Sequence, residues 1–145
     1  MKRLVITVMS VFVLFALTGC SYTAYGSEEA QTHPLDVKVR EKFDAAVTTL
    51  DMVEAAQYAG EEWDKLLNEN YRALMQKLNK EQQEQLRASQ REWIKFRDLE
   101  FKFDASFHSD RGGTIASINI ASFESNFVRQ RALELGHYLD YLEGL

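Results

Sequence analysis

The stretch that most restricts the possible folds of this chain is residues 90–107, QREWIKFRDLEFKFDASF. At the 100° per residue of an α-helix, its apolar side chains and those just before it fall on two separate arcs. The first arc holds Leu86, Trp93, Ile94 and Phe101, and the second holds Phe96, Leu99, Phe103 and Phe107. Because a surface helix normally has one apolar stripe, we expect this helix to have neighbours on two sides and to lie at the centre of a small bundle.

Two long polar side chains interrupt the first arc. Gln90 and Arg97 lie two helical turns apart on the same face as Trp93. Leaving such groups buried without partners costs several kcal/mol, so they must reach partners inside the bundle or on a ligand. We expect a structural polar network, which Asn68 of the preceding helix is placed to join.

The remaining sequence favours helices throughout. Pro34 is the only proline among 145 residues, no Asn-Gly or Asp-Gly turn occurs, and no segment alternates as a strand would. Apolar residues at spacings of three and four predict a short helix at 36–49 and three long helices after it. The predicted fold class is therefore all-α: a small helical bundle of about three long helices plus a short N-terminal helix.

Capping signals predict where the long helices begin. Thr48 with Asp51, and Asn79 with Gln82, have the form of capping boxes. These signals predict one long helix ending near Leu78 and a second ending near residue 107. The segment 108–113, HSDRGG, should end the second long helix and form a turn, and Thr114 should cap the last helix.

The first 19 residues have the form of a lipoprotein signal peptide. Lys2 and Arg3 precede an apolar run of 14 residues at 4–17, which is too short to span a bilayer comfortably. The run ends in 17–20, LTGC, which resembles a bacterial lipobox. That resemblance implies cleavage before Cys20 and attachment of lipid to its sulfur. We expect residues 20–35 to form a lipidated flexible tether, which includes His33, and 36–145 to form the helical domain.

The expected location is the cell envelope, with the membrane contacted through the N-terminal lipid. Ser21, rather than aspartate, follows Cys20, which in lipoproteins implies the periplasmic face of the outer membrane where the host has one. The formal net charge is −5, and loss of Lys2 and Arg3 leaves 15 basic and 22 acidic residues, a net charge of −7. This balance disfavours nucleic acid as a partner and favours a basic protein.

The sequence does not predict an enzyme, a cofactor or a metal site. Cys20 is the only cysteine, and lipidation would consume its thiol. His33, His108 and His137 lie in the tether, a predicted loop and the last helix, without the spacing of metal ligands. No G-x-S-x-G, P-loop or H-E-x-x-H motif occurs.

Two blocks in order carry a resemblance to a known family. They are 63–71, WDKLLNENY, and 86–98, LRASQREWIKFRD; weaker signals follow at 112–114, GGT, and 131–135, RALEL. Together they resemble the lysozyme inhibitor LprI-like domain family over about residues 43–139. The resemblance implies a small secreted helical domain, often on a lipoprotein, whose founding member inhibits lysozyme.

The chain departs from the family pattern at four positions. Family members usually have cysteines where this chain has Phe43, Ala55, Phe101 and Phe123. If the family cysteines form disulfides, apolar packing replaces them here. We predict that Phe101 touches Phe123 across the second and third long helices.

Three functional hypotheses follow. The first is a protein inhibitor that occludes the cleft of a basic wall-degrading enzyme such as lysozyme. Its candidate contacts are the loop residues His108, Ser109, Asp110 and Arg111, and a plain helix connection is the other interpretation of that loop. The second is a structural or regulatory envelope lipoprotein that binds another envelope protein without inhibiting lysozyme. The third is a binder of a small molecule or glycan through Asn68, Gln90 and Arg97, which requires a cavity at those residues.

Overall fold

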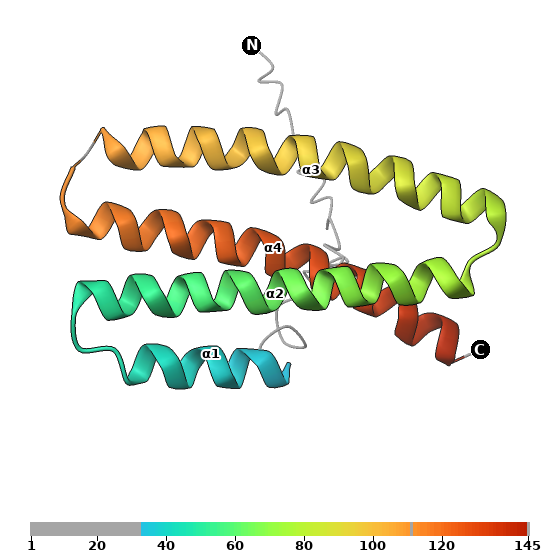
Figure 1. Cartoon of the computed structure of the whole chain (residues 1–145), viewed down its shortest axis with the longest axis horizontal. Coiled ribbons are helices and arrows are strands. Elements are labelled where there is room, and N and C mark those ends of the chain that lie inside the picture. Colours follow the sequence, from blue (N-terminus) through green and yellow to red (C-terminus); the bar gives the residue numbers. More distant parts are fainter. Residues whose placement is uncertain (1–32, 111, 145) are drawn as a thin grey trace, which may run out of the picture.

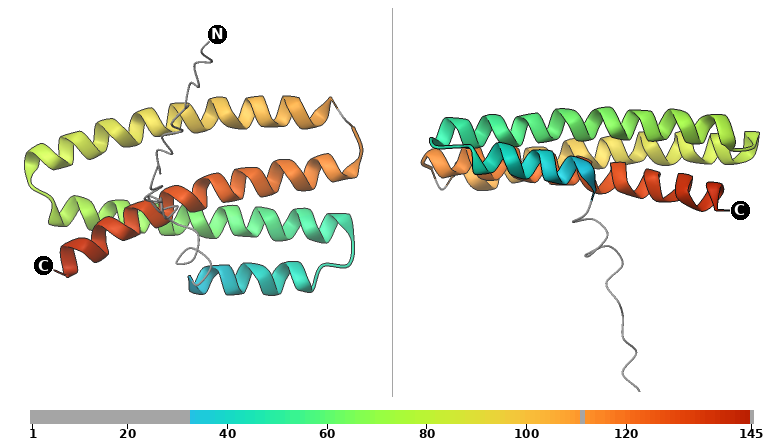
Figure 2. Two further views of the ribbon diagram at one scale, coloured as in Figure 1. Left: turned by 180° about the vertical axis from the view of Figure 1, so that it is seen from behind. Right: turned by 90° about the horizontal axis from the view of Figure 1, so that it is seen from below.

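The computed structural model describes residues 33–110 and 112–144, which form α1 (Pro34–Asp44), α2 (Thr49–Lys77), α3 (Lys80–Ser109) and α4 (Thr114–Glu143). The predicted all-α bundle of three long helices and a short N-terminal helix is confirmed (Figure 1). The helices lie roughly side by side in the order α3, α4, α2, α1, and the molecule is flat when seen along the row (Figure 2). The predicted signal peptide, Cys20, Ser21 and most of the tether lie outside the described residues.

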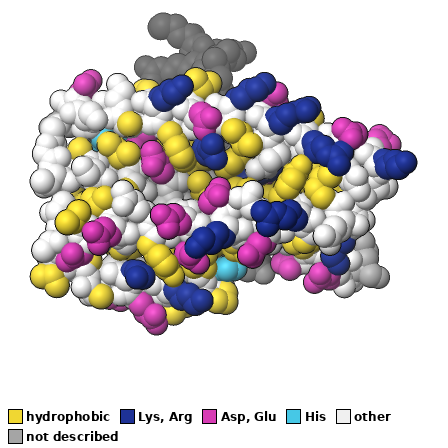
Figure 3. All heavy atoms as spheres, in the orientation of Figure 1, with side chains coloured by type: hydrophobic (Ala, Val, Ile, Leu, Met, Phe, Trp, Pro, Cys, Tyr) yellow, Lys and Arg dark blue, Asp and Glu magenta, His cyan; other side chains and the backbone are white. Residues whose placement is uncertain are grey.

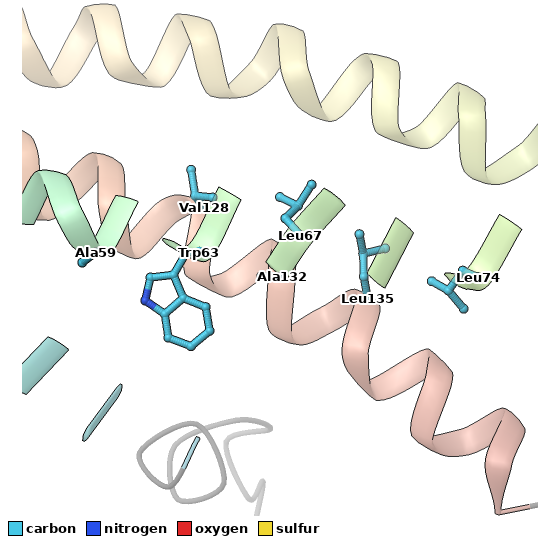
Figure 4. Close-up of a cluster of buried hydrophobic side chains, with 7 residues drawn as sticks. All are labelled: Ala59, Trp63, Leu67, Leu74, Val128, Ala132 and Leu135. Carbon is cyan, nitrogen blue, oxygen red and sulfur yellow. The ribbon is translucent and has the colours of Figure 1, made fainter. Parts of the chain in front are cut away.

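The hydrophobic core lies between α2 and α4. These two helices run in the same direction, because α3, which separates them in the sequence, runs in the opposite direction (Figure 1). Trp63 and Leu74 of α2 and Leu135 of α4 are the largest fully buried side chains. The buried cluster drawn in Figure 4 consists of Ala59, Trp63, Leu67, Leu74, Val128, Ala132 and Leu135. Small residues on both helices allow this close packing, and α1 and α3 then flank the α2–α4 pair.

The short helix α1 belongs more fully to the domain than the sequence predicts. His33 is its N-cap, and its Nδ1 accepts a hydrogen bond from the backbone N–H of Leu35 at 3.1 Å. Pro34 occupies the first helical turn, where its missing N–H costs nothing. Placing these residues in a flexible tether was therefore wrong, as was the end of this helix, which comes at Asp44 rather than at 49.

Contacts with the core hold α1 in place. Leu35 and Val39 pack against the buried cluster, and the His33 ring lies 5.1 Å from the Trp63 ring between centroids. Arg129 of α4 donates two hydrogen bonds to the Asp36 carboxylate, at 2.7 and 2.8 Å. Since both charged side chains are largely shielded from solvent, this bidentate pair fixes α1 on the bundle more firmly than an exposed ion pair would.

Both predicted capping boxes are confirmed. Thr48 Oγ1 accepts from the Asp51 N–H at 3.1 Å, and the Asp51 carboxylate accepts from the Thr48 N–H at 2.8 Å. Backbone N–H groups of Thr48 and Val47 hold the pKa of Asp51 below its ordinary value. Asn79 and Gln82 exchange the equivalent bonds at 3.0 and 3.1 Å, which fixes a short turn between α2 and α3.

The predicted cap at Thr114 is wrong. The N-cap of α4 is Gly113, with a φ of 83°, and it has no side chain to accept a hydrogen bond. Gly112 before it also has a positive φ, of 68°. Two successive residues in the left-handed region need glycine, so the backbone path of this turn takes the place of a side-chain cap.

The largest correction concerns α3, which is not the central helix. It lies at one edge of the row and packs chiefly against α4 (Figures 1 and 2). Its only buried residues are polar, Gln90 and Asp104. The first apolar arc does face the bundle through Leu86, Trp93 and Phe101, but Ile94 is exposed.

The second apolar arc of α3 faces solvent. The exposed fractions are 53% for Phe96, 64% for Leu99, 67% for Phe103 and 43% for Phe107. The prediction of neighbours on two sides fails because α2 and α4 cover each other, which leaves α4 as the principal partner of α3. We name these four residues the α3 apolar edge.

The predicted contact between Phe101 and Phe123 is confirmed. Their ring centroids lie 6.3 Å apart in an edge-on arrangement, and Phe127 lies 5.7 Å from Phe101. Edge-to-face pairs of this kind stabilise by about 0.5–1.5 kcal/mol beyond the area they bury. An aromatic cluster of Phe101, Phe123 and Phe127 thus joins α3 to α4.

Candidate functional site

Arg131 organises a polar cluster inside the bundle. This α4 side chain is buried, and its Nε donates to Gln90 Oε1 of α3 at 3.0 Å. Its terminal nitrogens donate to Glu134 at 2.7 Å and to Ser89 Oγ at 3.4 Å. Gln90 therefore has an internal partner, as expected, and the cluster ties α3 to α4 by satisfying groups that would be costly to bury alone.

The predicted network of Asn68, Gln90 and Arg97 does not form. Asn68 Nδ2 donates within its own helix, to the Asp64 carbonyl at 2.8 Å and to Asp64 Oδ2 at 2.9 Å. Arg97 donates to Asp98 at 2.7 and 3.0 Å and lies 5.5 Å above the Trp93 ring. Gln90 and Arg97 therefore have separate partners. Asn68 of α2 bonds to neither of them, because α3 packs chiefly against α4.

Ser89, Arg131 and Glu134 of the polar cluster also line a groove. It has a volume of about 430 Å³ and opens between the C-terminal halves of α2 and α4 and the start of α3. Leu74, Leu86, Ser89, Arg131 and Tyr138 are among its lining residues, and neither Asn68, Gln90 nor Arg97 is. A small-molecule or glycan site built on those three side chains is therefore not supported.

A second group of polar side chains lies on α3 and α4, closer to the turn between them. Asp104 is buried on α3, and its Oδ1 lies 3.5 Å from His108 Nε2. Asp104 Oδ2 has no hydrogen-bond partner among the described residues. Burial raises the pKa of the Glu124 carboxyl on α4, and the negative charge of Asp104 raises it further.

The predicted contact loop is divided by the structure. His108 and Ser109 belong to the last turn of α3, so the loop begins later than predicted, and His108 is turned toward Asp104. Asp110 is the exposed C-cap residue, and Arg111 lies outside the described residues. Of the four candidates, Ser109 and Asp110 are exposed near the turn and available to a partner.

The two turns that follow α1 and α3 lie at the same end of the molecule (Figures 1 and 2). Three apolar side chains project there: Val47 is 86% exposed, Leu50 65% and Ile115 59%. We name Val47, Leu50, Asp110 and Ile115 the two-turn end. The spacing of Val39, Phe43 and Val47 predicts that Val47 belongs to the first helix, but α1 ends at Asp44 and Val47 lies in the turn.

The α3 apolar edge makes aromatic contacts within α3 and with α4. Phe103 and Phe107 have ring centroids 6.1 Å apart, and Phe96 lies 5.7 Å from Phe127 of α4. Figure 3 shows apolar, basic and acidic side chains interspersed along the margin where α3 lies. The molecule thus has two candidate contact surfaces, the two-turn end and the α3 apolar edge.

A family model described as lysozyme inhibitor LprI matches residues 40–135, which span the end of α1, all of α2 and α3, and most of α4. The chain belongs to the LprI family. No curated protein and no solved structure matches the chain. The matched region includes Gln90, Arg131 and Glu134, so the polar cluster between α3 and α4 lies within the LprI domain.

LprI is a family of inhibitors rather than of enzymes. Within residues 33–110 and 112–144, no three acidic, histidine or cysteine side chains are grouped so that they could hold a metal ion. None of the helices described for this LprI domain is both long and apolar enough to cross a membrane.

Proposed function

We propose that this LprI protein inhibits lysozyme by direct binding. The observation that carries the proposal is the family match, which covers residues 40–135 and hence nearly the whole helical bundle. The net charge of −5 supports it, because an acidic inhibitor attracts a basic enzyme and speeds their encounter. An inhibitor needs no catalytic group of its own, only a surface that fills or covers the cleft of its target.

The two-turn end is the surface we assign to this contact. A cleft is blocked by a projecting part held on a rigid support, and the turns project from the ends of packed helices. Val47, Leu50 and Ile115 offer apolar area that lysozyme would remove from water, and Asp110 adds an exposed acidic group at the same end of the bundle. This arrangement resembles the usual interface pattern of an apolar centre with a polar rim.

The test is lysozyme activity titrated with the chain from Ser21, which retains every described residue. We expect stoichiometric inhibition that weakens from low to physiological salt, since screening reduces charge attraction. Replacing Val47 and Leu50 with serine should weaken inhibition at least tenfold. Tyr141→Ser is the matched control, because it removes an exposed aromatic side chain from the end of α4, away from both turns.

Circular dichroism should show that each variant keeps its helices. A folded protein that inhibits none of several lysozyme types would overturn the proposal and favour an envelope protein that binds another partner. Equal loss of inhibition in Tyr141→Ser would reject the two-turn end as the contact surface while leaving inhibition itself intact.

We also propose that the protein is anchored in the cell envelope by lipid on Cys20. The support is the LTGC sequence at 17–20 after a charged start and an apolar run. Metabolic labelling with an alkyne fatty acid should mark the natural chain and not Cys20→Ala, and labelling of both would contradict the proposal.

A further inference from the structure

We propose that the α3 apolar edge is the site where two copies of this chain pair, with their α3 helices antiparallel. Phe96, Leu99, Phe103 and Phe107 are between 43% and 67% exposed on one face of a long helix. Isolated exposed apolar residues need no explanation, but four large ones on one helical face form a continuous patch. The proposal concerns a surface distinct from the two-turn end and does not depend on inhibition.

The size of the patch suits a weak dimer. With roughly 200 Å² for a whole aromatic side chain, the exposed fractions amount to roughly 400 Å² of apolar surface on each copy. Pairing two copies would cover about 800 Å². Since interfaces are about 60% apolar, this corresponds to about 1,300 Å² in total, near the lower end for specific complexes. We therefore expect a dissociation constant in the micromolar range.

The charge of α3 favours a second copy over the other possible occupants. Residues 80–109 contain six basic and six acidic side chains, so this helix is neutral within an acidic chain. Local ion pairs neutralise several of them, including Arg87 with Glu84 and Lys95 with Glu92. A neutral surface gives no advantage to a basic enzyme or an anionic membrane, and it allows two identical helices to approach without repulsion.

The spacing of the four residues is self-complementary. The pairs Phe96/Phe107 and Leu99/Phe103 share a midpoint close to Phe101. A two-fold axis beside that midpoint makes the contact isologous, as in most homodimers. It places Phe96 against Phe107 of the second copy and Leu99 against Phe103 of the second copy, so each large side chain meets an apolar partner.

The first experiment is sedimentation equilibrium of the chain from Ser21 over a range of concentrations up to several hundred micromolar. We expect a reversible monomer–dimer equilibrium. The double variant Leu99→Ser/Phe103→Ser should weaken dimerisation at least tenfold and still fold, because both side chains are more than 60% exposed. The matched control is Val47→Ser/Leu50→Ser, which removes exposed apolar groups from the two-turn end and should leave dimerisation unchanged.

Cross-linking tests the direction of pairing. The chain from Ser21 has no natural cysteine, so only introduced thiols can form a disulfide. A mixture of Phe96→Cys and Phe107→Cys should cross-link on oxidation, while each variant alone should not. In the antiparallel dimer, position 96 lies about 16 Å from its own counterpart along the helix axis, which exceeds the reach of a disulfide.

The outcomes are distinct. A monomer at every concentration overturns the proposal, and so does efficient cross-linking of Phe96→Cys alone, which would indicate parallel helices. If the Leu99→Ser/Phe103→Ser variant instead loses lysozyme binding or vesicle binding while the natural chain stays monomeric, the edge has a different occupant. Because inhibition is tested at the two-turn end, dimerisation can fail while inhibition stands, and the reverse.

Discussion

The α2–α4 pair and α3 use the same kinds of residue in opposite ways. Between α2 and α4, Trp63, Leu74 and Leu135 are completely buried, and alanines let the helices approach closely. On α3, the buried residues are polar and several of the largest apolar side chains face solvent. The comparison teaches that burial follows from which helices pair, since the two apolar arcs of α3 alone predict a core helix.

The same substitution on the two regions should have very different consequences. Leu135→Ala removes a fully buried side chain and should lower the free energy of unfolding by about 2–5 kcal/mol. Leu99→Ala, at a leucine that is mostly exposed, should change it by less than about 0.5 kcal/mol for the monomer. Urea unfolding of both variants at low protein concentration measures the contrast, and equal losses would show that α3 is buried in solution.

Phe101→Ala probes the side of α3 that does face the bundle. Phe101 is only partly buried, so the loss should be about 2 kcal/mol, less than the about 3–5 kcal/mol of a fully buried phenylalanine. The measurement is again the urea midpoint, with Phe103→Ala as the control on the exposed face of α3. A loss no larger than that of the control would mean that the Phe101–Phe123 contact does not stabilise the α3–α4 pair.

Gln90→Ala tests whether polar contacts hold α3 to α4. The substitution removes the acceptor of Arg131 Nε and leaves a buried N–H group unpaired. We expect destabilisation of about 1–3 kcal/mol, with slow amide exchange lost first in α3. Gln76→Ala, at an exposed position of α2, serves as the control; if Gln90→Ala matched it, the cluster would contribute nothing to stability.

The smallest expected effect comes from Glu124, and it depends on pH. Because the pKa of Glu124 is raised in the folded state, the folded protein binds this proton more tightly than the unfolded chain does. The resulting stabilisation is present below the ordinary glutamate pKa and is lost as pH rises through the raised value. Glu124→Gln should therefore be more stable than the natural chain at neutral pH and show no such gain in acid.

Unfolding measured at both pH values checks this sign, with Glu69→Gln on the exposed face of α2 as the control. If Glu124→Gln were also more stable than the natural chain in acid, the gain in stability would not come from the charge of Glu124. Asp104→Asn removes the negative charge that adds to this shift, so it should bring the pKa of Glu124 closer to its ordinary value.

Much of the local structure could be predicted from the sequence. The Thr48/Asp51 and Asn79/Gln82 capping boxes, the number and type of helices and the break at the glycine pair all depend on short-range hydrogen bonds and backbone preferences. The Phe101–Phe123 contact was predictable as well, from the family resemblance and the antiparallel order of α3 and α4. The family itself was identifiable from two blocks of residues, and the match over 40–135 shows it.

The candidate surfaces were less predictable. The burial of Arg131 was not predicted, and Gln90, which accepts its hydrogen bond, was expected to join Asn68 and Arg97 instead. Val47 continues the four-residue spacing of Val39 and Phe43, which predicts a helical position, but α1 ends at Asp44 and leaves Val47 exposed in the turn. Such assignments need the order of helices in space, which depends on contacts between residues far apart in the chain.

The sequence by itself determined four helices, the capping boxes of α2 and α3 and membership of the LprI family, because each rests on local chemistry or on residue identity. Only the tertiary structure decided which helices form the core. An amphipathic pattern indicates that one face of a helix can be buried. In this chain α2 and α4 bury each other and leave one face of α3 exposed to solvent. That competition between helices for apolar contact is a property of the whole chain, and it created the surface where we expect a second copy to bind.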